Sequence, residues 1–226
     1  MNALNDKNFL LYFITNTLSL LGTWIQKIGV GWLTWEMTHS TFWTSFVTLS
    51  LMAPAGIFGP LFAVFAERWD MRKASLYLKI LMLLVGIGIW YMEHLQYHTL
   101  LSLAFLSILQ GLIQACYHPV RLVFISEVVP REMLSSAVGL NAASFNASRV
   151  IGPSIAGFLI YFFDLQTTFL VALLTYLPLI PILIVMKLNN RKKSILEKKN
   201  FFGRLIEGGR VAIHTPIIFK CLFLVL

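Results

Sequence analysis

Polar side chains recur along one face of two long apolar segments of this chain. The two polar stripes consist of Asn16, Ser19, Thr23 and Lys27, with Gln26 beside them, and of Gln110, Gln114, His118 and Arg121. Each set follows the three-to-four-residue spacing that places side chains on one side of an α-helix. Because polar groups are costly in an apolar environment, two such faces turned toward each other predict a water-filled path. Its chemistry would be the recognition of a passing molecule by amides, hydroxyls and charges.

Two other interpretations of the stripes stay open. Polar side chains of this kind also form hydrogen-bonded contacts between helices in membranes. Lys27 lies about 28 Å along its helix from Asn8, close to the far end, so its ammonium group could reach the membrane surface.

Arg149 lies near the middle of another apolar segment, about 20 Å from either end at helical rise. An unpaired arginine at that depth costs several kcal/mol, roughly 3 on insertion scales. We therefore expect Arg149 to face a functional cavity or an anionic substrate, with a structural polar contact as the alternative.

A third cluster occupies a short loop that reads Glu67-Arg68-Trp69-Asp70-Met71-Arg72-Lys73. Acidic and basic residues at the ends of two helices joined so tightly can lock those helices together by ion pairs. We predict that Glu67, Arg68, Asp70, Arg72 and Lys73 form a conformational latch. The alternative is that the basic residues only record the orientation of the chain in the membrane.

Composition explains what must position these residues. The chain has 226 residues, of which 58% are hydrophobic and only 12% charged, and its mean hydropathy is +0.76. Soluble domains are about 25% charged, and no single core of this size could hide so much apolar surface. These numbers exclude a soluble enzyme and a secreted scaffold and predict a polytopic membrane protein. The net charge of +8 comes from short basic runs between apolar stretches, which favours membrane orientation over nucleic-acid binding.

Six stretches are long enough to cross the bilayer as helices, since a span needs roughly 20 mostly apolar residues. They are Phe9–Trp35, Phe42–Ala66, Ser75–Met92, Leu100–Val123, Ser136–Phe163 and Phe169–Met186. The predicted fold is therefore an all-α membrane protein with a six-helix transmembrane domain over residues 1–187. A basic cytoplasmic linker over 188–216 and the truncated start of a seventh helix over 217–226 would follow.

The loops between the predicted spans differ in charge. Lys and Arg gather at the N-terminus, in the second and fourth loops and in the linker, whereas the loops after Trp35, Met92 and Phe163 contain none. Basic loops stay in the cytoplasm, so the N-terminus and the linker are predicted to lie on the cytoplasmic side of the inner membrane. No nucleophile–base pair, metal cluster or phosphate loop is present in the sequence, so neither an enzyme, a metal nor a cofactor is predicted.

The chain resembles the major facilitator superfamily, and within it the secretion-effector branch that includes the enterobactin exporter and macrolide efflux proteins. The resemblance is carried by the loop from Ala63 to Lys73, with Asp70 typical of that branch, and by residues 22–27, 31–33, 119–121, 127–132 and 141–157. It implies a substrate path between two six-helix halves, opened alternately to each side. The first and fourth helices would line that path.

The resemblance also assigns parts to several residues. Gly152, Pro153 and Gly157 match a fifth-helix packing motif of antiporters that export their substrates. Ser107 stands where drug antiporters of the superfamily often carry an arginine, so Arg149 or Lys27 would have to replace it in proton coupling.

The leading hypothesis is the N-terminal half of a proton-coupled exporter of a small amphipathic molecule, drug-like or siderophore-like. The predicted substrate path consists of Asn16, Thr23, Gln26, Lys27, Gln110, Gln114 and Arg149. The expected partners are the substrate, a coupling proton, the lipid bilayer and a C-terminal half that this chain lacks. The alternatives are an uptake transporter of the same architecture and a half-length protein without transport activity of its own.

Overall fold

The structure is a computed structural model that describes residues 3–66 and 69–186. The chain divides into two compact units, Met1–Asn190 and Arg191–Leu226, and the described residues belong to the first. The predicted linker over 188–216 and the predicted start of a seventh helix over 217–226 lie outside the described residues. So do Glu67 and Arg68 of the predicted latch.

The described residues are helical almost throughout and contain no strand. The helices are α1 (Lys7–Thr38), α2 (Thr41–Ala66), α3 (Met71–His94), α4 (Leu100–Val128), α5 (Leu134–Phe162), α6 (Leu165–Tyr176) and α7 (Leu179–Val185), with short 3-10 turns at Ala3–Asn5 and Arg131–Met133. The predicted all-α six-helix fold is confirmed, with α6 and α7 together in the place of the sixth predicted helix. The predicted bounds counted only apolar residues, so α3 begins earlier than Ser75 and α4 continues beyond Val123.

The sixth predicted span is the one that differs in form. It was expected as one helix over Phe169–Met186, but it begins at Leu165 and is interrupted between Tyr176 and Leu179, giving α6 and α7. Pro178 lies at the break. Proline has no N–H to donate and its ring crowds the carbonyl group four residues earlier, which weakens the helix at this point. The effect depends on its surroundings, because α2, α4 and α5 each continue through an internal proline.

Side-chain caps define where four of the helices begin. Asp6, Asp70 and Asp164 accept hydrogen bonds from the backbone N–H groups of Phe9, Lys73 and Thr167, at 2.9, 3.1 and 2.5 Å, and Thr99 forms a capping box with Ser102. These bonds satisfy N–H groups that no helical carbonyl reaches. The bond from Thr167 also holds the pKa of the Asp164 carboxyl group below its ordinary value.

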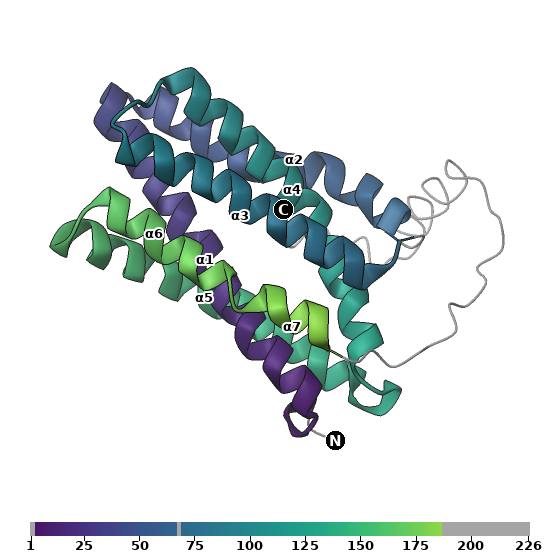
Figure 1. The fold of residues 1–226 in the computed structure, drawn as a ribbon. Coiled ribbons are helices and arrows are strands. Elements are labelled where there is room, and N and C mark those ends of the chain that lie inside the picture. Colours follow the sequence, from purple (N-terminus) through teal and green to yellow (C-terminus); the bar gives the residue numbers. More distant parts are fainter. Residues whose placement is uncertain (1–2, 67–68, 187–226) are drawn as a thin grey trace, which may run out of the picture. The chain divides into compact units, whose positions relative to one another are not determined.

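The helices pack in two neighbouring groups that α1 joins (Figure 1). In one group α4 lies between α2 and α3. In the other, α5 and α6 both pack along α1. Because α1 also contacts α2 and α4, it runs through the middle of the bundle, and its side chains face a different neighbour on each side.

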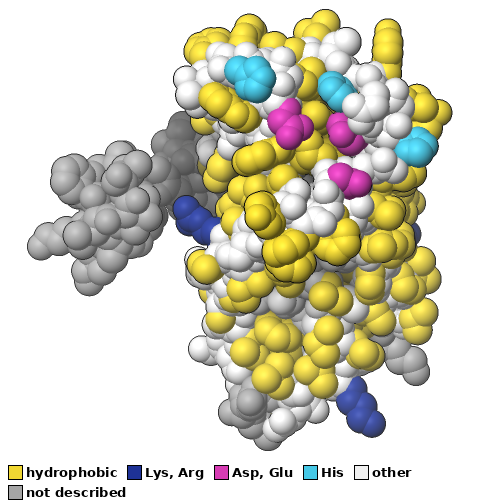
Figure 2. Space-filling model, turned by 90° about the vertical axis from the view of Figure 1, so that its left-hand side faces the viewer, with side chains coloured by type: hydrophobic (Ala, Val, Ile, Leu, Met, Phe, Trp, Pro, Cys, Tyr) yellow, Lys and Arg dark blue, Asp and Glu magenta, His cyan; other side chains and the backbone are white. Residues whose placement is uncertain are grey.

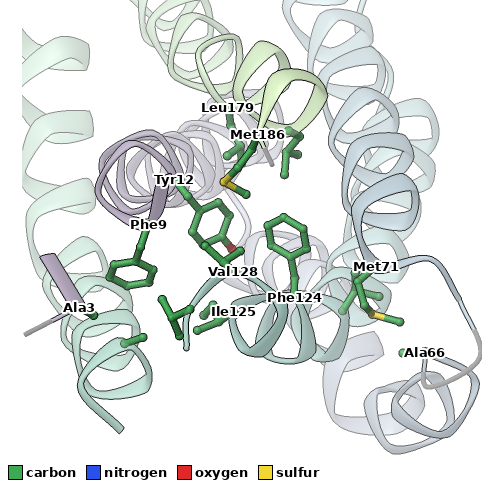
Figure 3. Packing of buried hydrophobic residues seen from close by; sticks show 14 residues of the cluster. Ala3, Phe9, Tyr12, Ala66, Met71, Phe124, Ile125, Val128, Leu179 and Met186 are labelled. Carbon is green, nitrogen blue, oxygen red and sulfur yellow. The ribbon is translucent and has the colours of Figure 1, made fainter. Parts of the chain in front are cut away.

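Buried apolar residues fill the bundle in separate clusters. The largest lies where α1 begins and α4 ends, and Figure 3 shows Phe9, Tyr12 and Phe124 within it. The Tyr12 and Phe124 rings meet edge to face with their centroids 5.2 Å apart. Met71 and Leu179 join the same cluster from α3 and α7, so this end of the bundle is closed by packed side chains.

The outer surface of the bundle is largely apolar (Figure 2). Four segments in the described part of the chain are long and apolar enough to cross a membrane: Thr41–Ala66, Met71–His94, Leu100–Val128 and Leu165–Val185. The helices α1 and α5, with 32 and 29 residues, are also long enough but carry more Ser, Thr and Asn side chains than any of these four segments. Figure 2 also shows the acidic and histidine side chains gathered at one end of this face, above the Lys and Arg side chains.

Gly111 allows α4 to approach α2 closely. A Cβ atom at this position would lie 2.5 Å from the Ser50 carbonyl oxygen and 2.9 Å from Cγ of Pro54. Backbone atoms cannot move aside as the end of a flexible side chain can. The absence of a side chain at Gly111 therefore sets the spacing of these two helices.

We predict that Gly111→Ala lowers the stability of the bundle, by about 1–3 kcal/mol, because α2 must move outward to admit the methyl group. The measurement is the thermal unfolding midpoint of the purified protein in detergent. Gly139→Ala is the matched control, since nothing lies within 4 Å of the Cβ position there. Equal midpoints for the two variants would show that the close approach does not matter.

Candidate functional site

A cavity of about 490 Å³ lies between α1, α2, α4 and α5. It is lined by Trp24, Lys27, Leu51, Met52, Ala55, Gly59, Pro60, Ala63, Gln114, Ala115, His118, Pro119, Leu122, Phe145 and Arg149. The wall that α2 contributes is entirely apolar. The other three helices contribute every polar lining side chain, so the cavity has one apolar and one polar side.

Two cations of the polar side share one aromatic ring. Lys27 Nζ lies 4.5 Å from the centroid of the Trp24 ring, and Arg149 Cζ lies 6.0 Å from it. Such contacts hold a cation through the negative face of the ring but leave its charge in place. Trp24 in turn meets Phe145 edge to face at 6.2 Å. The aromatic pair therefore fixes the position of two positive charges at the cavity wall.

A third cation stands next to the same pair. Arg121 is only 3% exposed, and its Cζ lies 5.3 Å from the centroid of the Phe145 ring. The cavity lining contains no Asp or Glu from the described part of the chain. No cluster of three or more His, Cys, Asp and Glu side chains suited to a metal ion occurs within residues 3–66 and 69–186. The cavity thus has a positive polar side, and its chemistry is the binding of a molecule by charge, hydrogen bonds and apolar contact.

Three of the seven predicted path residues line this cavity: Lys27, Gln114 and Arg149. The other four, Asn16, Thr23, Gln26 and Gln110, do not, and each is at most 3% exposed. They lie within the bundle. Asn16, Gln26 and Gln110 form hydrogen bonds between helices, and the Thr23 hydroxyl group donates to the Ser19 carbonyl oxygen within α1. A place for these four residues in a substrate path stays a prediction.

The buried hydrogen bonds converge on α1. Gln110 Nε2 and the Tyr176 hydroxyl group both donate to Gln26 Oε1, at 3.3 and 2.7 Å, which joins α4 and α6 to α1. The Tyr117 hydroxyl group donates to Asn16 Oδ1 at 3.1 Å. One face of α1 is therefore held inward by polar contacts.

Lys79 on α3 is a buried cation that the sequence analysis did not single out. Its side chain is 0% exposed, its Nζ donates to Ser19 Oγ at 2.8 Å, and the centroid of the Tyr117 ring lies 4.0 Å away. No carboxylate among the described residues forms an ion pair with it. A lysine inside the predicted span Ser75–Met92 was the available signal, because cations are rare at such positions.

The described members of the predicted latch have structural partners of their own. Asp70 caps α3, and Arg72 Nε donates to the Leu183 carbonyl oxygen of α7 at 2.6 Å. Lys73 is exposed. The beginning of α3 is thereby tied to α7 through Arg72.

The predicted packing motif lies along one continuous helix. A Cβ atom at Gly152 would lie 2.5 Å from Cβ of Trp24, so α5 approaches α1 closely beside the cavity. Gly157 has open space around its Cβ position, and Pro153 lies inside α5 without ending it.

A bundle of long apolar helices around a cavity that is part cationic and part apolar is the architecture of a polytopic membrane protein. The particular family follows from comparison with known sequences. The chain belongs to the family of transmembrane secretion effectors within the major facilitator superfamily, which it matches over residues 1–223. The resemblance stated from the sequence motifs is thereby confirmed.

Several curated bacterial proteins are similar to the chain. An uncharacterized MFS-type transporter of Bacillus subtilis, YfiS, is 26% identical over 167 residues, which is 73% of this chain and 39% of that protein. The Staphyloferrin A transporter of Staphylococcus aureus is 22% identical, covering 92% of this chain and 54% of its own length. The multi-drug resistance efflux pump PmrA of Streptococcus pneumoniae is 22% identical, covering 70% and 37%. The chain thus spans about half or less of the length of these relatives.

We predict that Lys79→Met keeps or raises the thermal unfolding midpoint of the protein in detergent. Methionine has a similar length, and it removes a buried charge that lacks an acidic partner. Lys79→Ala, in contrast, should lower stability by about 2–5 kcal/mol, because it leaves a cavity among α1, α3 and α4. If the two variants were equally destabilised, the ammonium contacts to Ser19 and Tyr117 would outweigh the cost of burying the charge.

Proposed function

We propose that the chain forms the N-terminal half of a proton-coupled exporter that moves a small amphipathic molecule across the bacterial inner membrane by alternating access. The observation that carries the proposal is the two-sided cavity, in which an apolar wall of α2 faces Lys27, Gln114 and Arg149. A molecule with one polar and one apolar part can be bound there without leaving either part against the wrong surface. The cavity volume of about 490 Å³ is typical of small-molecule sites.

The membership of the chain in a transporter family supports this proposal. One relative is called an efflux pump and another a Staphyloferrin A transporter, which favours a small molecule as cargo. The second wall of the path would come from a C-terminal half, since the chain spans only part of its relatives. We place the N-terminus and the basic loops on the cytoplasmic side, because Lys and Arg are absent from the opposite loops.

The proton carrier is proposed among the cations of the cavity. Ser107, which is fully buried, stands at the position where related antiporters often carry an arginine, and its hydroxyl group is uncharged. Lys27 and Arg149 both line the cavity proposed to bind the substrate. Because arginine stays protonated in proteins, Lys27 is proposed to lose and regain the proton beside Arg149, which would couple proton movement to substrate binding.

The test of export uses inside-out vesicles that contain the protein expressed from its complete gene. We expect a fluorescent amphipathic molecule to accumulate in these vesicles when a proton gradient is imposed, and an uncoupler to abolish the accumulation. Accumulation in right-side-out vesicles alone would instead show uptake. No transport in either orientation would contradict the proposal.

We predict that Ala55→Trp blocks transport, because Ala55 lies on the apolar wall and an indole ring would fill part of the cavity. The expected loss of rate is about tenfold or more, as for a substrate displaced from its site. Ile57→Trp is the matched control, since Ile57 lies on the same helix, is 65% exposed and does not line the cavity. Unchanged transport by a normally folded Ala55→Trp protein would show that the cavity is not part of the substrate path.

The residues Glu67, Arg68, Asp70, Arg72 and Lys73 are proposed as the latch that holds the cytoplasmic ends of the helices together. The bond between Arg72 and the Leu183 carbonyl oxygen supports a joining role for this segment. A latch on the cytoplasmic side stabilises the state that is closed there and open to the outside.

We therefore predict that Arg72→Ala lowers the labelling of an outer-facing cysteine by an impermeant maleimide. The reporter is Thr48→Cys near the outer half of α2, in a protein whose Cys116 and Cys221 are replaced by serine. Arg131→Ala, which removes a cation from the other basic loop, serves as the control. Equal labelling of the reporter protein, its Arg72→Ala variant and its Arg131→Ala variant would refute the proposed latch.

A further inference from the structure

We infer that the substrate of this cavity is an organic anion, whose carboxylate or similar acidic group is bound by Lys27 and Arg149 and whose apolar body lies against α2. The inference rests on the proposed function and names the chemical class of its substrate.

One side of the cavity wall is positively charged. Lys27 and Arg149 approach the same indole ring from the lining of one cavity, and Arg121 adds a third positive charge beside Phe145. Among residues 3–66 and 69–186, no carboxylate lines the cavity to compensate them. Like charges held close together in a medium of low dielectric repel each other, so an anion placed between them is stabilised by both.

The location of the acidic residues supports this argument. The Asp and Glu residues of the described chain are Asp6, Glu36, Asp70, Glu93, Glu127, Glu132 and Asp164, and they lie at or near the ends of helices. Lys27 and Arg149 lie well inside α1 and α5. At about 1.5 Å per residue, Glu36 is roughly 13 Å along α1 from Lys27, beyond the reach of an ion pair.

The cavity also contains a buried amide oxygen, Gln114 Oε1, that is available to accept a hydrogen bond. Gln114 lines the cavity, and its Oε1 atom has no hydrogen-bond partner among the described residues although it is buried from solvent. A buried polar atom without a partner is costly, and a donor on the substrate would satisfy it. A hydroxyl or N–H group next to the acidic group of the substrate would meet this requirement, because Gln114 lies on the polar side of the same cavity.

The apolar side of the cavity indicates what the rest of the substrate must be. Leu51, Met52 and Pro60 of α2 form an apolar wall, and Trp24 and Phe145 add ring surface near the cations. A fully polar anion would leave this wall without contacts. The substrate is therefore an amphipathic anion, with an aromatic or aliphatic body attached to the charged group.

The experiment compares three probes that share one fluorophore. Dansylglycine carries a carboxylate, dansylglycinamide is neutral, and dansylcadaverine is cationic. Their transport into inside-out vesicles and their binding to the purified protein, expressed from its complete gene, are measured side by side. We expect dansylglycine to be transported and bound about tenfold or more better than the other two, as for a charge-assisted hydrogen bond.

Variants of the cation pair test whether these residues cause the preference. Lys27→Gln and Arg149→Gln should each reduce binding of dansylglycine by about tenfold and leave dansylglycinamide unaffected. Arg149→Lys should restore part of the binding. Arg131→Gln is the control for a basic residue outside the cavity, and folding of every variant is checked by its elution from a sizing column.

The outcomes separate the inference from the function on which it rests. Transport of the neutral or cationic probe in preference to dansylglycine would overturn the inference and keep the exporter. Selective binding of dansylglycine without transport of any probe would support the inference and contradict the exporter. No binding of any probe, or an anion preference that survives both glutamine substitutions, would overturn the inference.

Discussion

The amide oxygen of Gln26 is the point on which much of this bundle depends. It accepts hydrogen bonds from Gln110 on α4 and from Tyr176 on α6, so three helices meet at one buried acceptor. In a membrane interior no water can replace these bonds, and a polar side chain left alone there would be costly. Once Gln26 points inward, helical geometry turns its neighbours Lys27 and Trp24 toward other sides of α1. The cation and ring that define the cavity are thus positioned by a contact that does not touch it.

The bundle contains two sets of cations, and both are held by aromatic rings. Lys79 lies against Tyr117 in the closed interior, with Ser19 as its hydrogen-bond acceptor. Lys27 and Arg149 lie against Trp24 at the edge of an open cavity. In both places a cation lies against an aromatic ring, but only Lys27 and Arg149 line a cavity that a ligand could enter. A cation with no space beside it can only stabilise or destabilise the fold, whereas a cation at a cavity wall can exchange water for an anion.

Much of the fold was predictable from the sequence, because length and apolar content decide which segments can cross a bilayer. The limits of that reasoning are visible in three places. The break at Pro178 was missed because the apolar residues on either side predict one continuous span, and hydropathy takes no account of the missing N–H group. Lys79 was missed because it lies only about one turn inside the predicted span Ser75–Met92, where a lysine can ordinarily extend to the membrane surface, whereas here it is fully buried. The stripe from Asn16 to Lys27 was recognised as one face, but periodicity does not tell which neighbour that face meets.

The predicted path residues fall into two groups, those buried between helices and those that line the cavity. Residues 16, 23, 26 and 110 have short side chains or amides that end inside the bundle, where Tyr117 and Tyr176 supply partners. Lys27 is turned by about 100° around α1 from Gln26 and lies against the Trp24 ring at the cavity wall. Position around the helix therefore divides the polar residues of α1 into an interior part that fixes the helices and a part that meets the cavity. A shorter polar residue at position 27 would be expected to lose the contact with the Trp24 ring, and the cavity would then retain only one of its two lining cations.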